Sequence, residues 1–239
     1  MTLLFLSFFT AVLMSCGEAE ATDPTPDEPI GMDMCDQLYP PLDTVITSHT
    51  NFAKGHYPKR IQQFQQDTIA PGDVVMLGNS LTEQGGNWGA KLGISSVKNR
   101  GISGDNTDGV MARLNELLCN EPSTVFLMIG TNDLWVNYSA DKVAGNIDQI
   151  ATALMDELPE TRVIVQTIMP LAAGHEKQDK LIAINNLLLG MDARPYELAD
   201  THTAMSNEAG DLPQEYTTDG VHLTVAGYSK WVELLTENL

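Results

Sequence analysis

Basic residues are scarce in this chain, and their scarcity excludes one class of partner. The 239 residues carry 13 Lys and Arg against 32 Asp and Glu, which gives a formal net charge of −19 at pH 7. Proteins that bind nucleic acid need clustered Lys and Arg to neutralise phosphates. We therefore expect no nucleic-acid partner, and the negative field also disfavours strongly anionic substrates.

Long apolar stretches are missing as well. The most apolar segment, TLLFLSFFTAVLM over residues 2–14, is too short to span a bilayer comfortably and has the length of a signal-peptide core. It ends in LMSC, residues 13–16, which resembles a bacterial lipobox, where cleavage before the cysteine leaves a thiol that carries lipid. We therefore expect a lipoprotein signal peptide over residues 1–15 and lipidation at Cys16.

Basic residues are missing from the amino-terminal segment too, because no Lys or Arg precedes Lys54. A signal peptide normally opens with positive charge. Either the start lies upstream of Met1 or the targeting interpretation is wrong. A plain secretory signal with an incidental Cys16 is the alternative to a lipid anchor.

Residues 16–36 contain many acids, Thr and Pro and few bulky apolar groups. Such a segment cannot bury enough surface to offset the entropy lost on ordering. We expect the lipidated Cys16 and an acidic flexible tether here, followed by one globular domain over residues 37–239. The protein would then sit in the bacterial cell envelope, anchored on the extracytoplasmic side in the periplasm or at the cell surface.

Cysteine is also rare, with three in the chain. Once Cys16 is set aside, Cys35 and Cys119 remain, and an extracytoplasmic location permits a disulfide between them. Cys119 ends an amphipathic helical pattern and can equally be a small buried hydrophobe. The sequence leaves the pairing open.

What the chain does contain is a regular alternation of strand and helix patterns. Patterns typical of short strands occupy residues 73–78, 96–101, 124–130, 162–170 and 196–200, and two of them, 124–130 and 162–168, are nearly continuous apolar runs. Helical patterns occupy residues 57–67, 107–119, 139–158, 177–191 and 224–239. This alternation predicts βαβ units, hence a three-layer α/β/α sandwich around a parallel sheet of about five strands. Sites in such folds lie outside the carboxyl ends of the strands.

Ser80 follows the first of these strands within GNSLT, residues 78–82. A serine at this position is either a nucleophile raised towards solvent or a helix N-cap. Thr82 stands where the G-x-S-x-G elbow of α/β-hydrolases requires glycine, so that pattern is absent. The segment alone favours the cap.

Two further strand ends offer hydrogen-bond donors. Gly104 lies in NRGISGDNT, residues 99–107, where its backbone N–H can face a site. Asn132 lies in MIGTNDLW, residues 128–135, and its amide can donate to an oxyanion. The alternatives are a glycine turn for the first and an Asx turn for the second.

Asp219 and His222 stand three residues apart before the last helix, within YTTDGVHLTVAGY. A carboxylate bonded to one imidazole nitrogen leaves the other nitrogen free to act as a base. The alternative is a capped helix start with a surface histidine. His202, two residues after Asp200, is a weaker candidate for the base.

Four sequence blocks resemble, in order, the signature blocks of the SGNH (GDSL-type) hydrolase family: GNSLT, NRGISGD, GTND and DGVHLT. The resemblance covers residues from about 57 to the end, so the globular domain over 37–239 is an expected SGNH hydrolase domain. It is closest to the group related to platelet-activating-factor acetylhydrolase subunits and bacterial acetylesterases. Asn79 replaces the aspartate of the GDSL pattern, and that side chain is not one of the catalytic groups.

The resemblance implies a flavodoxin-like fold and a serine esterase that needs no metal or other cofactor. It places the nucleophile on Ser80, the acid and base on Asp219 and His222, and the oxyanion hole on Ser80, Gly104 and Asn132. Because no apolar insertion suggests a lipid tunnel, we expect short acyl groups such as acetyl, carried by a small ester or an acetylated saccharide. A lipase or lysophospholipase acting on longer chains is the alternative.

Large apolar residues near the blocks bear on the substrate. Trp88, Leu134 and Trp135 can wall the site, and a stacking platform for a sugar ring is one interpretation, but ordinary packing is the one that the sequence favours. A non-catalytic binding lipoprotein and a flavodoxin-like nucleotide or flavin binder are further alternatives. The first would lack part of the site, and the second would need a phosphate-binding loop that GNSLTEQGG does not supply. The sequence is silent on the oligomeric state.

Overall fold

The computed structural model describes residues 34–239. The expected signal peptide, the lipidation site Cys16 and most of the tether lie outside the described residues. Between residues 34 and 239, none of the helices has both the length and the apolar character needed to cross a bilayer.

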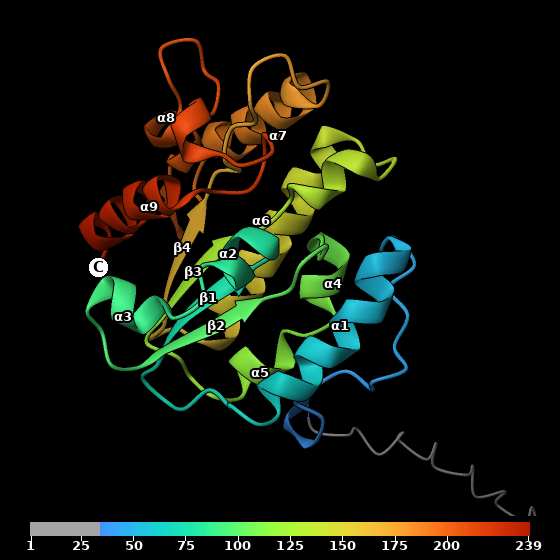
Figure 1. Ribbon diagram of the computed structural model, residues 1–239. Coiled ribbons are helices and arrows are strands. Elements are labelled where there is room, and N and C mark those ends of the chain that lie inside the picture. The colour runs from blue at the N-terminus through green and yellow to red at the C-terminus, as the bar shows by residue number, and fades with distance from the viewer. Residues whose placement is uncertain (1–33) are drawn as a thin grey trace, which may run out of the picture. The chain divides into compact units, whose positions relative to one another are not determined.

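The centre of the fold is a five-stranded sheet with the order β2-β1-β3-β4-β5 (Figure 1). All neighbouring strands pair in parallel. The strands are β1 Val74–Gly78, β2 Val97–Gly101, β3 Thr124–Met128, β4 Arg162–Gln166 and β5 Glu197–Ala199. This arrangement confirms the predicted parallel sheet. The chain runs outward from β1 to β2 and then returns to the other side of β1, so the strand order reverses between β1 and β3.

The helices have the following bounds: α1 Asn51–Phe64, α2 Ser80–Gln84, α3 Trp88–Leu92, α4 Thr107–Met111, α5 Asn115–Leu118, α6 Ala140–Glu157, α7 Gln178–Gly190, α8 Thr201–Met205 and α9 Val225–Glu237. Short 3-10 helices are η1 Met34–Asp36, η2 Asn132–Trp135 and η3 Gln214–Tyr216.

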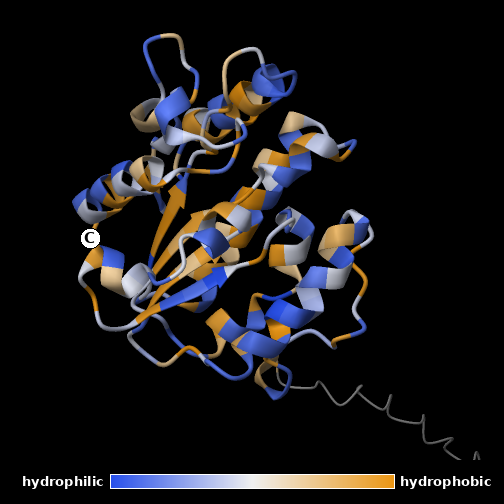
Figure 2. Ribbon diagram, in the orientation of Figure 1, coloured by the Kyte–Doolittle hydropathy of each residue, from blue (hydrophilic) through white to orange (hydrophobic). Residues whose placement is uncertain are grey.

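Two apolar cores separate the layers, because successive residues of a strand face opposite sides of the sheet. Val75 and Leu77 of β1 join the core under α4, α5, α6 and α7. Val74 and Met76, their neighbours, join the core under α2, α3, α8 and α9. The strands β1, β3 and β4 are accordingly apolar along most of their length, whereas the edge strand β2 is largely hydrophilic (Figure 2). The predicted α/β/α sandwich is confirmed.

Two predicted helices differ from the observed ones. The pattern over 107–119 forms α4 and α5, separated by a turn at residues 112–114 that directs Arg113 inward. The pattern over 57–67 belongs to α1, which begins at Asn51 with Thr50 as its N-cap. Pro58 lies inside α1. Because proline disfavours helix interiors, the sequence did not indicate that the helix extends back to Asn51.

Cys35 and Cys119 form a disulfide across 84 residues of sequence. The side-chain amide of Asn115 in α5 supports it by donating to the carbonyl oxygens of Met34 and Gln37 at 3.3 and 3.1 Å. The bond joins the start of the described chain to the segment between α5 and β3. It therefore lies towards the amino ends of the strands.

Candidate active site

Ser80 is placed by the junction of β1 with α2. Asn79 caps α2, its Oδ1 accepting the N–H of Leu81 at 3.0 Å. Ser80 is the first helical residue, so its own N–H has no acceptor within the helix. Tyr228 of α9 donates its hydroxyl to the carbonyl of Leu81 at 2.8 Å and fixes α2 against the second core.

His222 and Asp219 meet Ser80 from a loop before α9. Nε2 of His222 lies 3.0 Å from Oγ of Ser80, and Nδ1 lies 2.7 Å from Oδ2 of Asp219. A carboxylate can only accept, so Nδ1 carries the proton and Nε2 presents its lone pair to the serine hydroxyl. The three side chains form a hydrogen-bonded chain from acid to base to hydroxyl.

The loop itself is held by Asp219. Its Oδ1 accepts the backbone N–H groups of Val221 and His222 at 3.0 and 2.8 Å. Burial alone would raise the pKa of Asp219, but the hydrogen bonds from the His222 side chain and from these two N–H groups lower it below the ordinary value. Asp219 is thus kept as the anion that orients His222.

Gly104 and Asn132 come from the loops after β2 and β3. Gly104 has φ +82°, and a Cβ there would lie 2.9 Å from the side chain of Ala53 in α1, so both conformation and space require glycine. Nδ2 of Asn132 donates one N–H to the carbonyl of Asp105 at 2.7 Å. An amide nitrogen carries two hydrogens, and the second is available for a ligand. Ser80 and Asn132 follow β1 and β3, the two strands that flank the switch point, where ligands bind in open sheets.

Ordinary packing, the interpretation that the sequence favours for Trp88, Leu134 and Trp135, is confirmed for Trp88 and Leu134. Trp88 is buried, packs edge-on against Trp231 at 4.9 Å and donates Nε1 to the carbonyl of Thr82. Leu134 is buried in the first core. Trp135 is 49% exposed and packs edge-on against His175, so of the three only Trp135 is placed to contact a ligand.

His202, the weaker candidate for the base, lies on α8 and does not contact Ser80 in the described structure. Its Nε2 is buried and has no hydrogen-bond partner among the described residues. Burial lowers the pKa of His202, which the nearby Asp200 offsets in part. The geometry therefore favours His222.

Three side chains near the site were missed by sequence reasoning. Phe52 of α1 approaches Gly104, with its ring 3.5 Å from the position of a Cβ there, and stacks on His56. Nε2 of His56 lies 3.0 Å from both carboxylate oxygens of Glu83 in α2. The unrecognised start of α1 hid Phe52, and an exposed aromatic beside a helix cap is the signal that would have found it.

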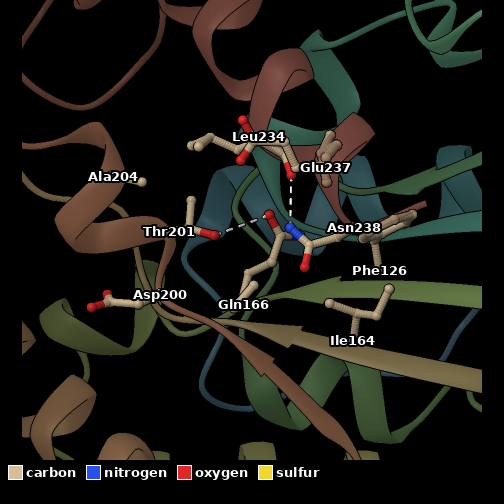
Figure 3. A pocket seen from close by; sticks show the side chains of 11 residues that line it. Phe126, Ile164, Gln166, Asp200, Thr201, Ala204, Leu234, Glu237 and Asn238 are labelled. Carbon is tan, nitrogen blue, oxygen red and sulfur yellow. Dashed lines mark hydrogen bonds between the residues drawn. The ribbon is translucent and has the colours of Figure 1, made fainter.

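The cavity in Figure 3 is separate from this constellation. It measures about 220 Å³ and lies between α8 and α9 over β3 and β4, and neither Ser80 nor His222 lines it. Gln166 at its floor accepts hydrogen bonds from Trp231 and Thr201 at 2.7 and 3.3 Å. Asp219 lines a different crevice of about 520 Å³. Within residues 34–239 no cluster of three His, Cys, Asp or Glu side chains is arranged to hold a metal ion.

The comparison with known families decides the class of this site. The model of the GDSL-like lipase/acylhydrolase family matches residues 72–230, a span that contains Ser80, Gly104, Asn132, Asp219 and His222. The chain belongs to this family. It is therefore an ester hydrolase, as the four sequence blocks predicted.

Relatives of the family support the assignment. The alpha2 subunit of platelet-activating factor acetylhydrolase IB from Homo sapiens is 30% identical over 173 residues, covering 69% of this chain and 75% of that protein. A GDSL-like lipase from Bacteroides thetaiotaomicron has a TM-score of 0.63 at 25% identity, covering 79% of this chain and 98% of the other. The acetyl xylan esterase AlAXEase shares the fold, with a TM-score of 0.60 at 19% identity over 70% of this chain and 99% of the other.

Proposed function

We propose that this GDSL-family protein is a serine esterase that removes short acyl groups, principally acetyl, from carbohydrate through an acyl-enzyme. The observation that carries the proposal is the hydrogen-bonded chain from Asp219 through His222 to the hydroxyl of Ser80. A hydroxyl, a base and an orienting carboxylate in this geometry are the parts that nucleophilic acyl transfer requires.

In the first half of the reaction, Nε2 of His222 takes the proton of Ser80 as Oγ bonds to the ester carbonyl carbon. The tetrahedral intermediate collapses when His222 returns that proton to the leaving alcohol, and the acyl group remains on Ser80. In the second half, water loses a proton to His222 and attacks the acyl carbon. His222 then gives this proton to Oγ of Ser80 as the bond between Oγ and the acyl carbon breaks, which releases the acid and restores the serine. Asp219 stabilises the imidazolium in both halves.

The developing oxyanion needs donors that are already in place. The N–H of Ser80, the N–H of Gly104 and Nδ2 of Asn132 supply three from three different strand ends. Each such donor contributes about 2.7–4 kcal/mol to transition-state stabilisation in serine hydrolases. The hydrogen bond from Asn132 to the carbonyl of Asp105 orients the amide before substrate arrives.

Two exposed aromatic rings support the proposal that the alcohol part of the substrate is a carbohydrate. Phe52 is 63% exposed beside Gly104, and Trp135 is exposed in the 3-10 helix that Asn132 begins. Exposed rings of this kind stack on the apolar face of a sugar. The acetyl group fits the names of the relatives, one an acetylhydrolase subunit and one an acetyl xylan esterase.

The proposal is tested with the purified chain from residue 34 onward on p-nitrophenyl esters and on acetylated sugars. We expect turnover of p-nitrophenyl acetate and of acetylated xylose oligomers, and little turnover of the palmitate ester. The reverse ranking would favour a lipase or lysophospholipase. Failure of Ser80 to react with a fluorophosphonate probe would favour a non-catalytic binding protein.

We also propose that the protein is held at the extracytoplasmic face of the bacterial envelope by lipid on Cys16. The disulfide between Cys35 and Cys119 supports an oxidising compartment, since such bonds are rare in reducing cytosol. Metabolic labelling with radioactive palmitate should mark the wild-type protein, and Cys16→Ser should release it from the membrane fraction. A labelled Cys16→Ser variant would refute the assignment, and an unlabelled wild type would favour plain secretion.

A further inference from the structure

We propose that the buried ion pair between Asp105 and Arg113 fixes the relative positions of the three oxyanion donors. Both side chains are then positioning residues for ester hydrolysis. This inference rests on the proposed function, because it assigns the pair a role in that reaction.

Asp105 is a fully buried carboxylate with partners on both oxygens. Its Oδ2 accepts hydrogen bonds from Nε and Nη2 of Arg113 at 3.0 and 2.9 Å. Its Oδ1 lies 2.9 Å from Nε2 of His49 and accepts the N–H of Asn106 at 3.1 Å. A buried pair of this kind is weak evidence for stability, because desolvation offsets the attraction between the charges. Its neighbours are the better guide to its role.

Arg113 connects the pair to the nucleophile. Its Nη2 also donates to the carbonyl oxygen of Gly78 at 3.1 Å. Gly78 ends β1, two residues before Ser80. The same carbonyl accepts the N–H of Ile102 at 3.1 Å, which begins the loop that carries Gly104. The guanidinium therefore holds the end of β1 against the loop after β2.

The backbone of Asp105 connects the pair to the other two donors. Gly104 directly precedes it in the chain, and its carbonyl oxygen accepts Nδ2 of Asn132 at 2.7 Å. Movement of Asp105 would shift the N–H of Gly104 and the amide of Asn132 together. All three donors thus depend on one ion pair, although they come from three strand ends.

The surrounding packing leaves room for this pair. A Cβ on Gly109 of α4 would lie 1.8 Å from Oδ1 of Asp105 and 2.7 Å from Nε2 of His49. Any larger residue at this position would push the carboxylate out of place. The glycine lets α4 approach the pair closely.

The chain offers a matched control in a second buried ion pair, between Arg100 and Glu116. Nε and Nη2 of Arg100 donate to the two oxygens of Glu116 at 2.8 and 2.6 Å. Both residues are buried, and Glu116 also accepts the hydroxyl of Tyr39 at 2.8 Å. Within the described residues this pair makes no hydrogen bond to an oxyanion donor.

The experiment compares Asp105→Asn, Arg113→Lys and Glu116→Gln with wild type, using p-nitrophenyl acetate well below the lowest melting temperature. Asp105→Asn and Glu116→Gln should both lose thermal stability, because each removes the carboxylate that is hydrogen-bonded to a buried arginine. The loss should be smaller in Glu116→Gln, since Asp67 remains 4.0 Å from Nη1 of Arg100. Of these two variants, Asp105→Asn alone should lower kcat, by about 10- to 100-fold with KM within about twofold. Arg113→Lys keeps the charge but lacks the planar fork, so kcat should fall here too.

A second readout does not need turnover. The side-chain amide resonances of Asn132, assigned with Asn132→Asp, should shift in Asp105→Asn and Arg113→Lys but not in Glu116→Gln. If the wild type proves inactive on every ester, the proposed function fails. The shifts of the Asn132 amide resonances would still show whether the ion pair positions this side chain. If Asp105→Asn does not fold, Arg113→Lys provides both readouts. An unmoved Asn132 amide, or an equal loss of kcat in Glu116→Gln, would overturn the inference.

Discussion

The hydroxyl oxygen of Ser80 lies 3.0 Å from Nε2 of His222, although 142 residues separate the two in sequence. The parallel sheet brings them together, because the loop before α9 packs over the carboxyl end of β1. The hydroxyl of Ser80 needs a general base that accepts its proton, and the imidazole of His222 can serve as that base only beside the hydroxyl. Predictions about catalysis follow from this pair.

Replacing the nucleophile should abolish turnover without harming the fold. In Ser80→Ala the proton acceptor His222 remains, but no oxygen attacks the ester. We expect kcat for p-nitrophenyl acetate to fall by a factor on the order of 10⁴ or more, with the melting temperature nearly unchanged. Ser229→Ala, an exposed hydroxyl on α9, is the control. A Ser80→Ala variant with most of its activity would refute the assignment.

The ring of Phe52 should lower KM for esters whose alcohol is a sugar, and it should not affect KM for esters of a small alcohol such as ethanol. Removing the ring in Phe52→Ala should raise KM for an acetylated sugar about 3- to 10-fold, the loss that corresponds to about 0.5–1.5 kcal/mol of ring stacking. KM for ethyl acetate, which has no ring, should stay within about twofold in a pH-stat assay. Leu42→Ala removes another exposed apolar side chain and should change neither value. Equal changes for both substrates would argue against a sugar-binding role.

Asp133 should make folding stability fall as pH rises. Burial raises the pKa of this carboxyl to about 6, more than the hydrogen bonds from Thr107 lower it. Between the ordinary pKa of aspartate and 6, the folded protein holds a proton that the unfolded chain has released, so the free energy of unfolding decreases with pH. The full effect is on the order of 3 kcal/mol and is reached above pH 6.

The test compares Asp133→Asn with wild type in urea unfolding at pH 4, 5, 6 and 7. The asparagine is isosteric, and its carbonyl oxygen can still accept from Thr107. The stability of the variant relative to wild type should therefore grow from pH 4 to pH 7. A constant difference across this range would show that Asp133 titrates normally.

Loss of the disulfide should destabilise the domain without changing its chemistry. Opening a loop of 84 residues enlarges the unfolded ensemble, and we expect the free energy of unfolding to drop by about 2–5 kcal/mol. The double variant Cys35→Ser with Cys119→Ser should show this loss in urea unfolding, while kcat at 25 °C stays near that of wild type. Unfolding that is insensitive to dithiothreitol would contradict the prediction.

The fold was predictable because its signals are local. The apolar run of β3 is nearly continuous, as a strand buried on both faces requires. The Asp-x-x-His spacing likewise allowed Asp219 and His222 to be placed on one turn. These features depend on a few neighbouring residues, so they can be recognised from a single sequence.

The missed features depend on residues far apart in the chain. The sequence singles out no role for Arg113 within the helical pattern over 107–119, and the break between α4 and α5 turns it towards Asp105. For Trp88 the sequence favours packing but does not identify the partners, which are Trp231 and the carbonyl of Thr82. Packing between distant segments decided each case, and no local pattern encodes it.

The disulfide also determines how the domain would bear mechanical load. Cys119 lies just before the amino end of β3, whereas Ser80 and Asn132 follow the carboxyl ends of β1 and β3. A pull on the chain ahead of Cys35 would pass through the sulfur atoms into the segment between α5 and β3, bypassing α1. Drag on an enzyme held by its amino-terminal segment would thus be taken up at the end of the sheet remote from hydrolysis.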